Sequence, residues 1–199
     1  MSKIVKLYVY NLDHIDEETA FALPYLQEID KEQAKRFKLL YMQKQNLVST
    51  YFKRKYCGDD IYYNAQGKPL SHFLFFNISH SQNLVVLVTS EDSDVGVDVE
   101  QIKHRGQSLR SYISSELELK YIVDDEKFFE VWTSKESLCK AEGSGLSTHL
   151  ADVAAFPFDG VKEYKGEIYR AKMIKYRDYV ISLTVKGLEE FEIEMIHER

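Results

Sequence analysis

Cysteine, proline and long apolar runs are all scarce in this chain. Its 199 residues include only two cysteines, Cys57 and Cys139, and three prolines. Two cysteines form at most one disulfide, and without an export signal we expect two free thiols in a cytoplasmic protein, one in a loop and one in a helix. The longest uninterrupted apolar run, Leu84 to Val88, is far too short to cross a bilayer. The first residues alternate like a strand, so we expect neither a signal peptide nor a membrane segment.

An excess of positive charge is also absent. The 26 basic and 32 acidic residues give a net charge of -6, which argues against general binding of nucleic acid. However, residues 31–55 contain eight basic residues and one acid, whereas residues 91–100 contain five acids and no base. This separation indicates a phosphate-bearing ligand held together with a cation, although two ordinary solvated surfaces give the same pattern.

Hydrophobic residues make up 44% of the chain, enough for one large domain or two small ones. Periodicity predicts a long helix over residues 31–56, capped by Asp30, and further helices at 108–114, 115–123 and 125–142. Strands are predicted at 3–10, 73–79, 84–89 and 95–100, and antiparallel strands at 153–156, 163–173, 178–185 and 191–195.

The order of helix and then strands occurs twice. The buried strand NLVVLVT (83–89) has a partial counterpart in DYVISLTV (178–185). This favours an α+β fold of two similar halves, residues 1–94 and 95–199, with a cleft at their junction near Asp94. Because any two buried strands look alike, the pattern alone leaves the duplication open.

The strand VGVDVE (95–100) carries two acids on one face. Its period of two puts Gly96, Asp98 and Glu100 together, with the two acidic Cα atoms roughly 7 Å apart. A divalent cation between these carboxylates would remove their repulsion, and Mg²⁺ suits such oxygen ligands. The alternative is a strand whose outer face is merely acidic.

The predicted helix 125–142 carries a carboxylate on its apolar face. Glu136 falls within the stripe formed by Phe128, Phe129, Trp132 and Cys139. A buried carboxylate must be neutral, paired or bound to metal. If the helix packs beside strand 95–100, Glu136 becomes a third metal ligand or a base, and Lys140, one turn later, supplies a cation. An exposed i, i+4 pair is the simpler alternative.

Two further segments contain small polar residues. FNISHS (76–81) offers Ser79 and His80 as donors to phosphate oxygens, although local backbone bonding is the commoner reason for such residues. No serine or cysteine has a partner histidine with an evident orienting acid, so we predict no nucleophile pair. GSG (143–145) is predicted to be a helix C-cap and a tight turn.

These segments together resemble the 4′-phosphopantetheinyl transferase superfamily, in particular the Sfp-type enzymes that activate carrier proteins of nonribosomal peptide, polyketide and fatty-acid synthesis. The matching motifs, in the family's order, are GKP (67–69), FNISHS (76–81), GVDVE (96–100), WTSKESLCK (132–140) and GSGLS (143–147). The resemblance implies Mg²⁺-dependent transfer of the phosphopantetheine arm of coenzyme A to a serine of an apo acyl or peptidyl carrier protein, releasing 3′,5′-ADP. It also implies a pseudo-dimeric fold with coenzyme A in the cleft between two α/β halves, and hence a monomer.

The resemblance also implies individual roles. They are metal ligation by Asp98, Glu100 and Glu136, catalysis by Glu136 and Lys140, and coenzyme A contacts by Lys68, Ser79, His80 and Lys140. In these roles Glu136 takes the proton of the serine, and Lys140 steadies charge on the pyrophosphate. Coenzyme A contacts would thus lie mainly in residues 1–94, and the metal and catalytic residues in 95–199. The choice of Mg²⁺ over Mn²⁺, and of carrier, stays open.

The first helix departs from the family pattern. Sfp-type enzymes place basic residues there to hold coenzyme A, and an alignment on KRF (35–37) puts Gln33 and Gln45 at such positions. Lys31 or Lys44 are candidates to compensate. Two other functions remain open, a non-catalytic module that binds coenzyme A or a carrier protein, and another Mg²⁺-dependent phosphate-ester enzyme.

Overall fold

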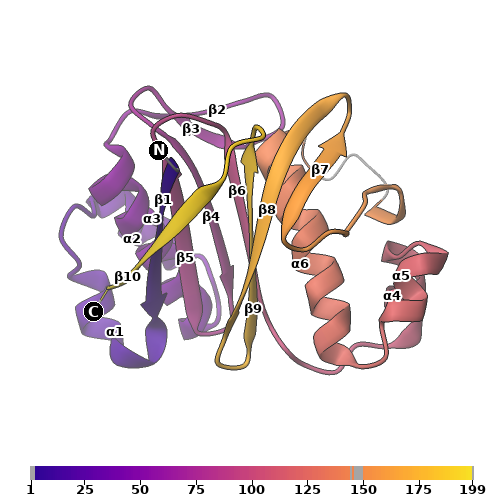
Figure 1. Cartoon of the computed structure of the whole chain (residues 1–199). Helices are drawn as coiled ribbons and strands as arrows, with labels where there is room; N and C mark the ends of the chain where they lie inside the picture. The colour runs from indigo at the N-terminus through magenta and orange to yellow at the C-terminus, as the bar shows by residue number, and fades with distance from the viewer. Residues whose placement is uncertain (1–2, 144, 146–149, 199) are drawn as a thin grey trace.

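The computed structural model describes residues 3–143, 145 and 150–198. Over these residues the fold is α+β, with helices outside two four-stranded sheets (Figure 1). The first part of the chain forms β1 (Lys3–Asn11), η1 (Leu12–His14), α1 (Glu17–Phe21), α2 (Glu28–Ala34), α3 (Leu40–Cys57), β2 (Ile61–Tyr63), β3 (Pro69–Ser71), β4 (Phe75–Ser81) and β5 (Leu84–Ser90). The second part forms β6 (Val95–Gln101), α4 (Gln107–Ile113), α5 (Glu116–Tyr121), α6 (Asp125–Glu142), η3 (Leu150–Asp152), β7 (Gly160–Tyr164), β8 (Glu167–Tyr176), β9 (Tyr179–Lys186) and β10 (Phe191–Glu198).

The two sheets meet along their edge strands. The first has the order β10-β1-β5-β4 and the second β6-β9-β8-β7, while β2 and β3 form a separate hairpin. All strand pairs are antiparallel except β1 with β10, which run parallel. The edge strands β4 and β6 therefore lie next to each other at the junction of the sheets.

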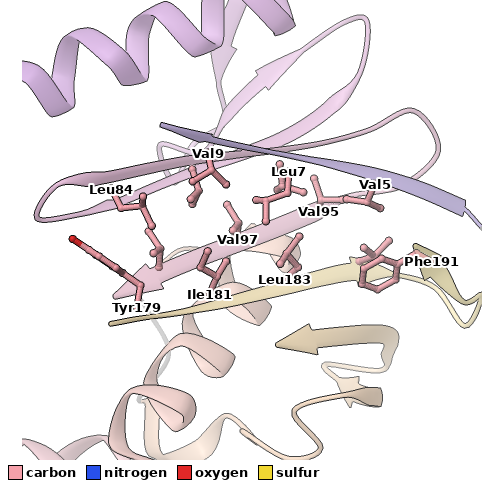
Figure 2. Close-up of a cluster of buried hydrophobic side chains, with 14 residues drawn as sticks. Val5, Leu7, Val9, Leu84, Val95, Val97, Tyr179, Ile181, Leu183 and Phe191 are labelled. Atoms are coloured by element: carbon pink, nitrogen blue, oxygen red, sulfur yellow. The ribbon is translucent and has the colours of Figure 1, made fainter. Parts of the chain in front are cut away.

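A single hydrophobic core lies between the two sheets. Figure 2 shows side chains of β1, such as Leu7, directed toward Val97 of β6 and Leu183 of β9. Strand alternation explains this arrangement, because residues 95, 97 and 99 of β6 enter this core while Gly96 and Asp98 face the other way. Because both sheets contribute, neither encloses this core alone.

Helices cover the outer faces of the sheets. Leu47, Val48 and Phe52 of α3 pack on the first sheet in a second core. Phe128, Phe129 and other residues of α6 belong to a third core on the outer side of the second sheet. Helix α6 begins after Asp124, whose carboxylate accepts the Lys127 N–H, and ends at left-handed Gly143. None of the helices within the described residues is long and apolar enough to cross a membrane.

Most predicted elements are confirmed, and α6 spans the predicted residues 125–142. The long helix 31–56 is wrong, because residues 35–39 separate α2 from α3. Asp30 is the third residue of α2, where its carboxylate accepts the Gln27 N–H in a capping box. Phe37 and Tyr41, which a continuous helix was expected to bury, are exposed. Residues 35–39 therefore lack the packing of an apolar face that stabilises most helices in proteins.

The C-terminal third contains further corrections. Residues 153–156 form no strand, because side chains satisfy their backbone: Ala155 N–H donates to Glu118, and its carbonyl accepts from Ser134 and Lys162. The run 163–173 spans two strands, β7 and β8, separated by a turn. The last strand, β10, was expected to be antiparallel but pairs parallel with β1. Cys57 ends α3 rather than lying in a loop, and both thiols are free and buried.

Candidate active site

A glycine lets α6 approach β6 closely. A Cβ atom on Gly96 would lie 2.1 Å from the Ser137 carbonyl oxygen and 2.4 Å from the Ala141 nitrogen, both backbone atoms of α6. Any larger residue would push the helix away from the strand. This contact places residues 136–141 of α6 over the face of β6 that carries Asp98 and Glu100.

Small polar residues complete the contact between α6 and its sheet. Ser137 Oγ lies 2.9 Å from Thr184 Oγ1 of β9, and Thr133 Oγ1 lies 3.3 Å from Ser182 Oγ. The aromatic stripe thus faces the third core, whereas a separate stripe of small hydroxyls faces the sheet. Glu136 lies between these surfaces and is 7% exposed.

Side chains of FNISHS bridge the two sheets. Asn77 Oδ1, Ser79 Oγ and Ser81 Oγ accept the backbone N–H groups of Val97, Val99 and Gln101 at 3.0, 3.4 and 3.2 Å. Each contact lies two residues further along both strands than the one before. The edge of β6 that faces β4 has no backbone hydrogen bonds to a neighbouring strand, and these side chains of β4 take their place. We refer to these three contacts as the polar ladder.

The hydroxyls of the polar ladder also hold the acids of β6. Ser79 donates to Asp98 Oδ1 at 2.9 Å, and Ser81 donates to Glu100 Oε2 at 2.7 Å. Lys140 reaches the same acid from α6, with Nζ 2.6 Å from Asp98 Oδ1, 3.1 Å from Ser79 Oγ and 3.2 Å from the Val97 carbonyl. Asp98, Lys140 and Ser79 therefore meet at this point.

Two of the carboxylates, Glu136 and Glu100, have raised pKa values. Burial, and then the charge of Asp98, raises the pKa of Glu136 to about 7, although Lys140 opposes the shift. Burial also raises the pKa of Glu100, with a smaller contribution from Asp98 and an opposing hydrogen bond from Ser81. The three acids thus form one region of unfavourable negative charge, which a cation would relieve.

The donor set fits a hard divalent cation in its chemistry. The second oxygen of Asp98, Oδ2, is buried without a hydrogen-bond partner among the described residues. An unpaired carboxylate oxygen is available to Mg²⁺, which prefers oxygen ligands and is usually held by one or two carboxylates together with water and substrate phosphates. As the side chains stand, however, no three acidic, histidine or cysteine residues of the described chain gather closely enough to hold a metal. Instead, Asp98 Oδ1 accepts a hydrogen bond from the Lys140 ammonium.

Two adjoining grooves lead to these residues. The α3 groove, of about 430 Å³, is lined by Phe37, Met42, Gln45, Asn46, Ser49, Lys53, Ile78, Ser79, His80, Asp98 and Lys140. The hairpin groove, of about 250 Å³, is lined by Gln66, Gly67, Lys68, Pro69, Asn77, Ile78, Glu136, Cys139, Lys140, Gly143 and Gly145. Ile78 and Lys140 line both, so a long ligand can pass from one groove to the other along Lys140.

The grooves contain the other predicted contact residues. Lys68, on the turn between β2 and β3, donates to the Ala141 carbonyl at 3.1 Å and pairs with Asp94 at 3.3 Å. Asn64 of the same turn donates to the Gly143 carbonyl, so the hairpin satisfies the end of α6. His80 is exposed at the α3 groove, where dense surroundings and then the charge of Lys140 lower its pKa. Ser144, Leu146 and Ser147 of the GSGLS motif lie outside the described residues.

Sequence reasoning missed three features of this region. Gly96 was placed on the acidic face but not against a helix. Asn77 was not selected, although its side chain anchors β6. The third is a fully buried ion pair between Lys135 and Glu118 at 2.6 Å, in which Lys135 also donates to the carbonyls of Ile113 and Leu150. The spacing of the lysine in WTSKES revealed nothing of this partner, because Glu118 lies on another helix.

Comparison with known proteins finds one family that part of the chain is similar to. A family model described as the 4′-phosphopantetheinyl transferase superfamily matches residues 94–184, which include β6, α6 and all of the proposed metal and catalytic residues. This matched part of the chain is thus similar to the superfamily. The matched region begins just before β6 and ends near the end of β9.

Several relatives carry the same description. The 4′-phosphopantetheinyl transferase HetI of Nostoc sp. is 34% identical over 99 residues, 43% of this chain and 42% of HetI. The 4′-phosphopantetheinyl transferase Sfp of Bacillus subtilis is 32% identical over 117 residues, 52% of each chain. The transferase ffp, also of Bacillus subtilis, is 28% identical over 166 residues, 73% of this chain and 74% of ffp. The chain spans about half or less of the length of HetI and Sfp, so its own activity and partners are matters of inference.

Proposed function

We propose that this protein transfers the 4′-phosphopantetheine arm of coenzyme A to a serine hydroxyl of an apo acyl or peptidyl carrier protein. The observation that carries the proposal is that Lys140 binds Asp98 in one groove and also lines the adjoining groove, which contains Glu136. A long, phosphate-bearing substrate requires such a place, where acids for a metal and a lysine for the diphosphate act on one bond. The relatives' descriptions support the same reaction.

In the proposed reaction the serine oxygen attacks the phosphorus that carries the pantetheine arm. The bond from this phosphorus to the oxygen of the neighbouring phosphate breaks, and 3′,5′-ADP leaves with that oxygen. Glu136, which lines the hairpin groove, takes the serine proton. Lys140 turns its ammonium from Asp98 toward the diphosphate and offsets the charge that develops on the leaving group.

Asp98, Glu100 and Glu136 are the residues that would hold Mg²⁺ or Mn²⁺. When bound, such an ion would offset part of the negative charge of the diphosphate and of these acids. Ser79 and Ser81 position two of these ligands through the polar ladder. Lys68 and His80 line the hairpin groove and the α3 groove, and we assign both to coenzyme A contacts.

The proposed site lies between two halves, residues 1–94 and 95–199. Strand β5 is buried throughout and β9 at all but its last residue, and both lie inside a four-stranded sheet with helices on its outer face, which supports a pseudo-dimeric arrangement. In this arrangement the last strand, β10, crosses back to the first sheet. Since one chain provides both grooves, we propose a monomer.

Mass spectrometry of intact carrier proteins tests the reaction. A panel of apo acyl and peptidyl carriers is incubated with the protein, coenzyme A and Mg²⁺ or Mn²⁺, with EDTA as the control. We expect a gain of one phosphopantetheine on at least one carrier, lost in EDTA and lost when its acceptor serine is replaced by alanine. Binding of coenzyme A without a mass gain on any carrier would favour a non-catalytic module. Cleavage of coenzyme A without a carrier would favour another phosphate-ester enzyme.

A further inference from the structure

The outer face of the first sheet is only partly covered by helices. Helix α3 packs on this face and ends at Cys57, and its last turn stacks Tyr56 on Tyr8 of β1, with ring centroids 3.8 Å apart. Beside this stack, β1, β5 and β10 form the floor of a groove of about 800 Å³, larger than either groove of the proposed active site. We refer to it as the β1 groove. Its volume lies in the range of ligand-binding pockets, about 300–1,000 Å³.

The floor of the β1 groove carries two opposite charges that do not pair. Lys6 of β1 and Glu194 of β10 are register partners on adjacent strands, so both side chains lie on the same face of the sheet. Neither has an ion-pair partner within 4.0 Å among the described residues. Both charges act on Tyr8: burial raises the pKa of Tyr8, Lys6 opposes the shift and Glu194 adds to it. Each of the two charges therefore remains available to a ligand.

The rim of the groove adds negative charge. Glu91 and Asp92 directly follow the end of β5, are exposed, and have no basic side chain within 4.0 Å in the described chain. Lys3 and Glu189, also on the rim, compensate each other in an ion pair at 3.2 Å. Among the described lining residues, three carboxylates and one ammonium are thus uncompensated.

The groove also presents apolar surface. Ile4 of β1 is 60% exposed, and Leu74, which precedes β4, lines the groove together with the stacked rings of Tyr8 and Tyr56. An exposed apolar surface that is rimmed by polar residues is typical of an interaction site.

The charges discriminate between classes of ligand. The carboxylates repel nucleic acid and other polyanions. A polyamine matches the carboxylates, but it has no group that accepts a hydrogen bond from the Lys6 ammonium. A peptide matches both, because its basic side chains pair with the carboxylates and its backbone carbonyls accept hydrogen bonds from Lys6.

A second copy of this chain is disfavoured as the occupant. Residues 35–41, KRFKLLY, combine basic and apolar side chains and are all exposed, so they have the matching chemistry. Their insertion into the β1 groove of another copy would, however, join two different surfaces head to tail, and such a contact builds open chains unless its rotation closes a ring. It would also cover Phe37, which lines the α3 groove of the proposed active site.

We propose that the β1 groove binds an extended basic peptide segment of a partner protein. Basic side chains of the segment pair with Glu194, Glu91 and Asp92, and aliphatic side chains between them cover Ile4 and Leu74. The β1 groove shares no lining residue with the two grooves of the proposed active site. The peptide site is therefore separate from the proposed transfer reaction.

Fluorescence anisotropy with a labelled hexapeptide of alternating arginine and leucine tests this site. The reference peptide has glutamine in place of each arginine. We expect wild type to bind the arginine peptide about tenfold more tightly than the reference, because only the former carries the charges that pair with the carboxylates. Glu194→Gln should weaken the arginine peptide about fivefold, as should the double variant Glu91→Gln/Asp92→Asn.

The matched control is Glu163→Gln, which removes the same charge from an exposed position on β7, outside the groove. It should leave the affinity unchanged. Equal affinities of wild type for the two peptides would overturn the proposal, as would equal losses in Glu194→Gln and Glu163→Gln. Competition by spermine that matches competition by the unlabelled arginine peptide would also overturn it, in favour of a polyamine.

Lys6→Met distinguishes a peptide site from general attraction of positive charge. In a peptide site this variant loses a donor to a backbone carbonyl, so it should bind the arginine peptide about threefold more weakly. If the carboxylates merely attract cations, removal of a positive charge would tighten binding, and that result would contradict the proposal. Lys6→Gln repeats the measurement if the methionine variant does not fold.

Two measurements on the protein itself complete the test. Sedimentation of wild type should show no self-association that depends on Glu194; association abolished by Glu194→Gln would assign the groove to a second copy instead. In the carrier assay, Glu194→Gln should transfer at the wild-type rate, because this residue lies outside both grooves of the proposed active site. Loss of transfer in a folded variant would show that the β1 groove is part of the active site and not a separate peptide site.

Discussion

At the scale of single residues, the charged form of Glu136, which the proposed chemistry needs, destabilises the folded protein. Its pKa is raised from 4.5 to about 7 by burial and by Asp98, so the folded state binds the proton more tightly than the unfolded state. The stability that this binding provides is present below pH 4.5 and is lost as pH rises through 7. A buried carboxylate that lowers the stability of the fold near neutral pH indicates a functional role rather than a role in folding.

Glu136→Gln should therefore separate stability from activity. At pH 8 in EDTA we expect the variant to unfold at higher urea concentration than wild type, with a gain of about 1–3 kcal/mol, because the amide carries no charge. In the carrier assay its transfer should fall below detection, because the amide cannot accept the serine proton. A variant that still transfers at a near-normal rate would remove the base role, and an unchanged urea midpoint would refute the charge argument.

Lys162 is a second buried residue with an unusual charge state. It is 3% exposed on β7 and donates to Ser134 Oγ and the Ala155 carbonyl. Burial lowers the pKa of its ammonium from 10.5 to about 7, with Glu118 opposing and Lys135 reinforcing the shift. The unfolded chain thus binds more protons between pH 7 and 10.5, so this residue makes stability rise with pH in that window.

Lys162→Met should flatten that dependence. Urea unfolding at pH 7 and pH 9.5 should show wild type gaining stability relative to the variant by about 1–3 kcal/mol as pH rises. Because every other titrating group is common to both proteins, the difference between them isolates Lys162. Parallel pH profiles for the two proteins would mean that Lys162 is charged in the folded state and paired by other means.

At the scale of elements, the site depends on how closely α6 lies to β6. Gly96→Ala should be strongly destabilising, because its Cβ would meet two backbone atoms of α6, which cannot move as a flexible side chain can. We expect a loss of about 3 kcal/mol or more in urea unfolding, together with loss of transfer. Gly106→Ala is the control, since a Cβ there meets nothing within 4 Å. Full activity in Gly96→Ala would show that the helix position is not critical.

The sequence predicts elements better than it predicts their partners. Helix α6 was located correctly because its 3.6-residue period and the cap predicted at GSG (143–145) agree. Asp98 and Glu100 followed from strand alternation alone. The polar ladder could not be foreseen, because serines that bind an adjacent strand look like serines of any turn. The parallel pairing of β10 was missed for a similar reason, since alternation assigns faces but not neighbours.

At the scale of the whole molecule, the two halves are interdependent. The core between the sheets contains 14 buried residues, drawn from both of them. In addition, β10 (Phe191–Glu198) completes the first sheet although it ends the second half. Glu198 binds Lys55 and the hydroxyl of Tyr56, which ties that strand to α3. A boundary at residue 94 thus follows the proposed symmetry of the two halves. It does not separate two packing units, because the shared core and β10 join residues from both sides of it.

Fragments 1–94 and 95–199 should therefore fail to fold separately. Half of the shared core would be exposed in each, at a cost on the order of 10 kcal/mol, comparable to the whole stability of a small domain. Fragment 1–94 would also lack β10, leaving the edge of β1 unpaired. We expect near-UV circular dichroism and dispersed amide spectra to appear only when the fragments are mixed, and transfer to return with them. A cooperative unfolding transition in either fragment alone would show that one sheet and its helices form an independent domain, so that the shared core joins two folded units.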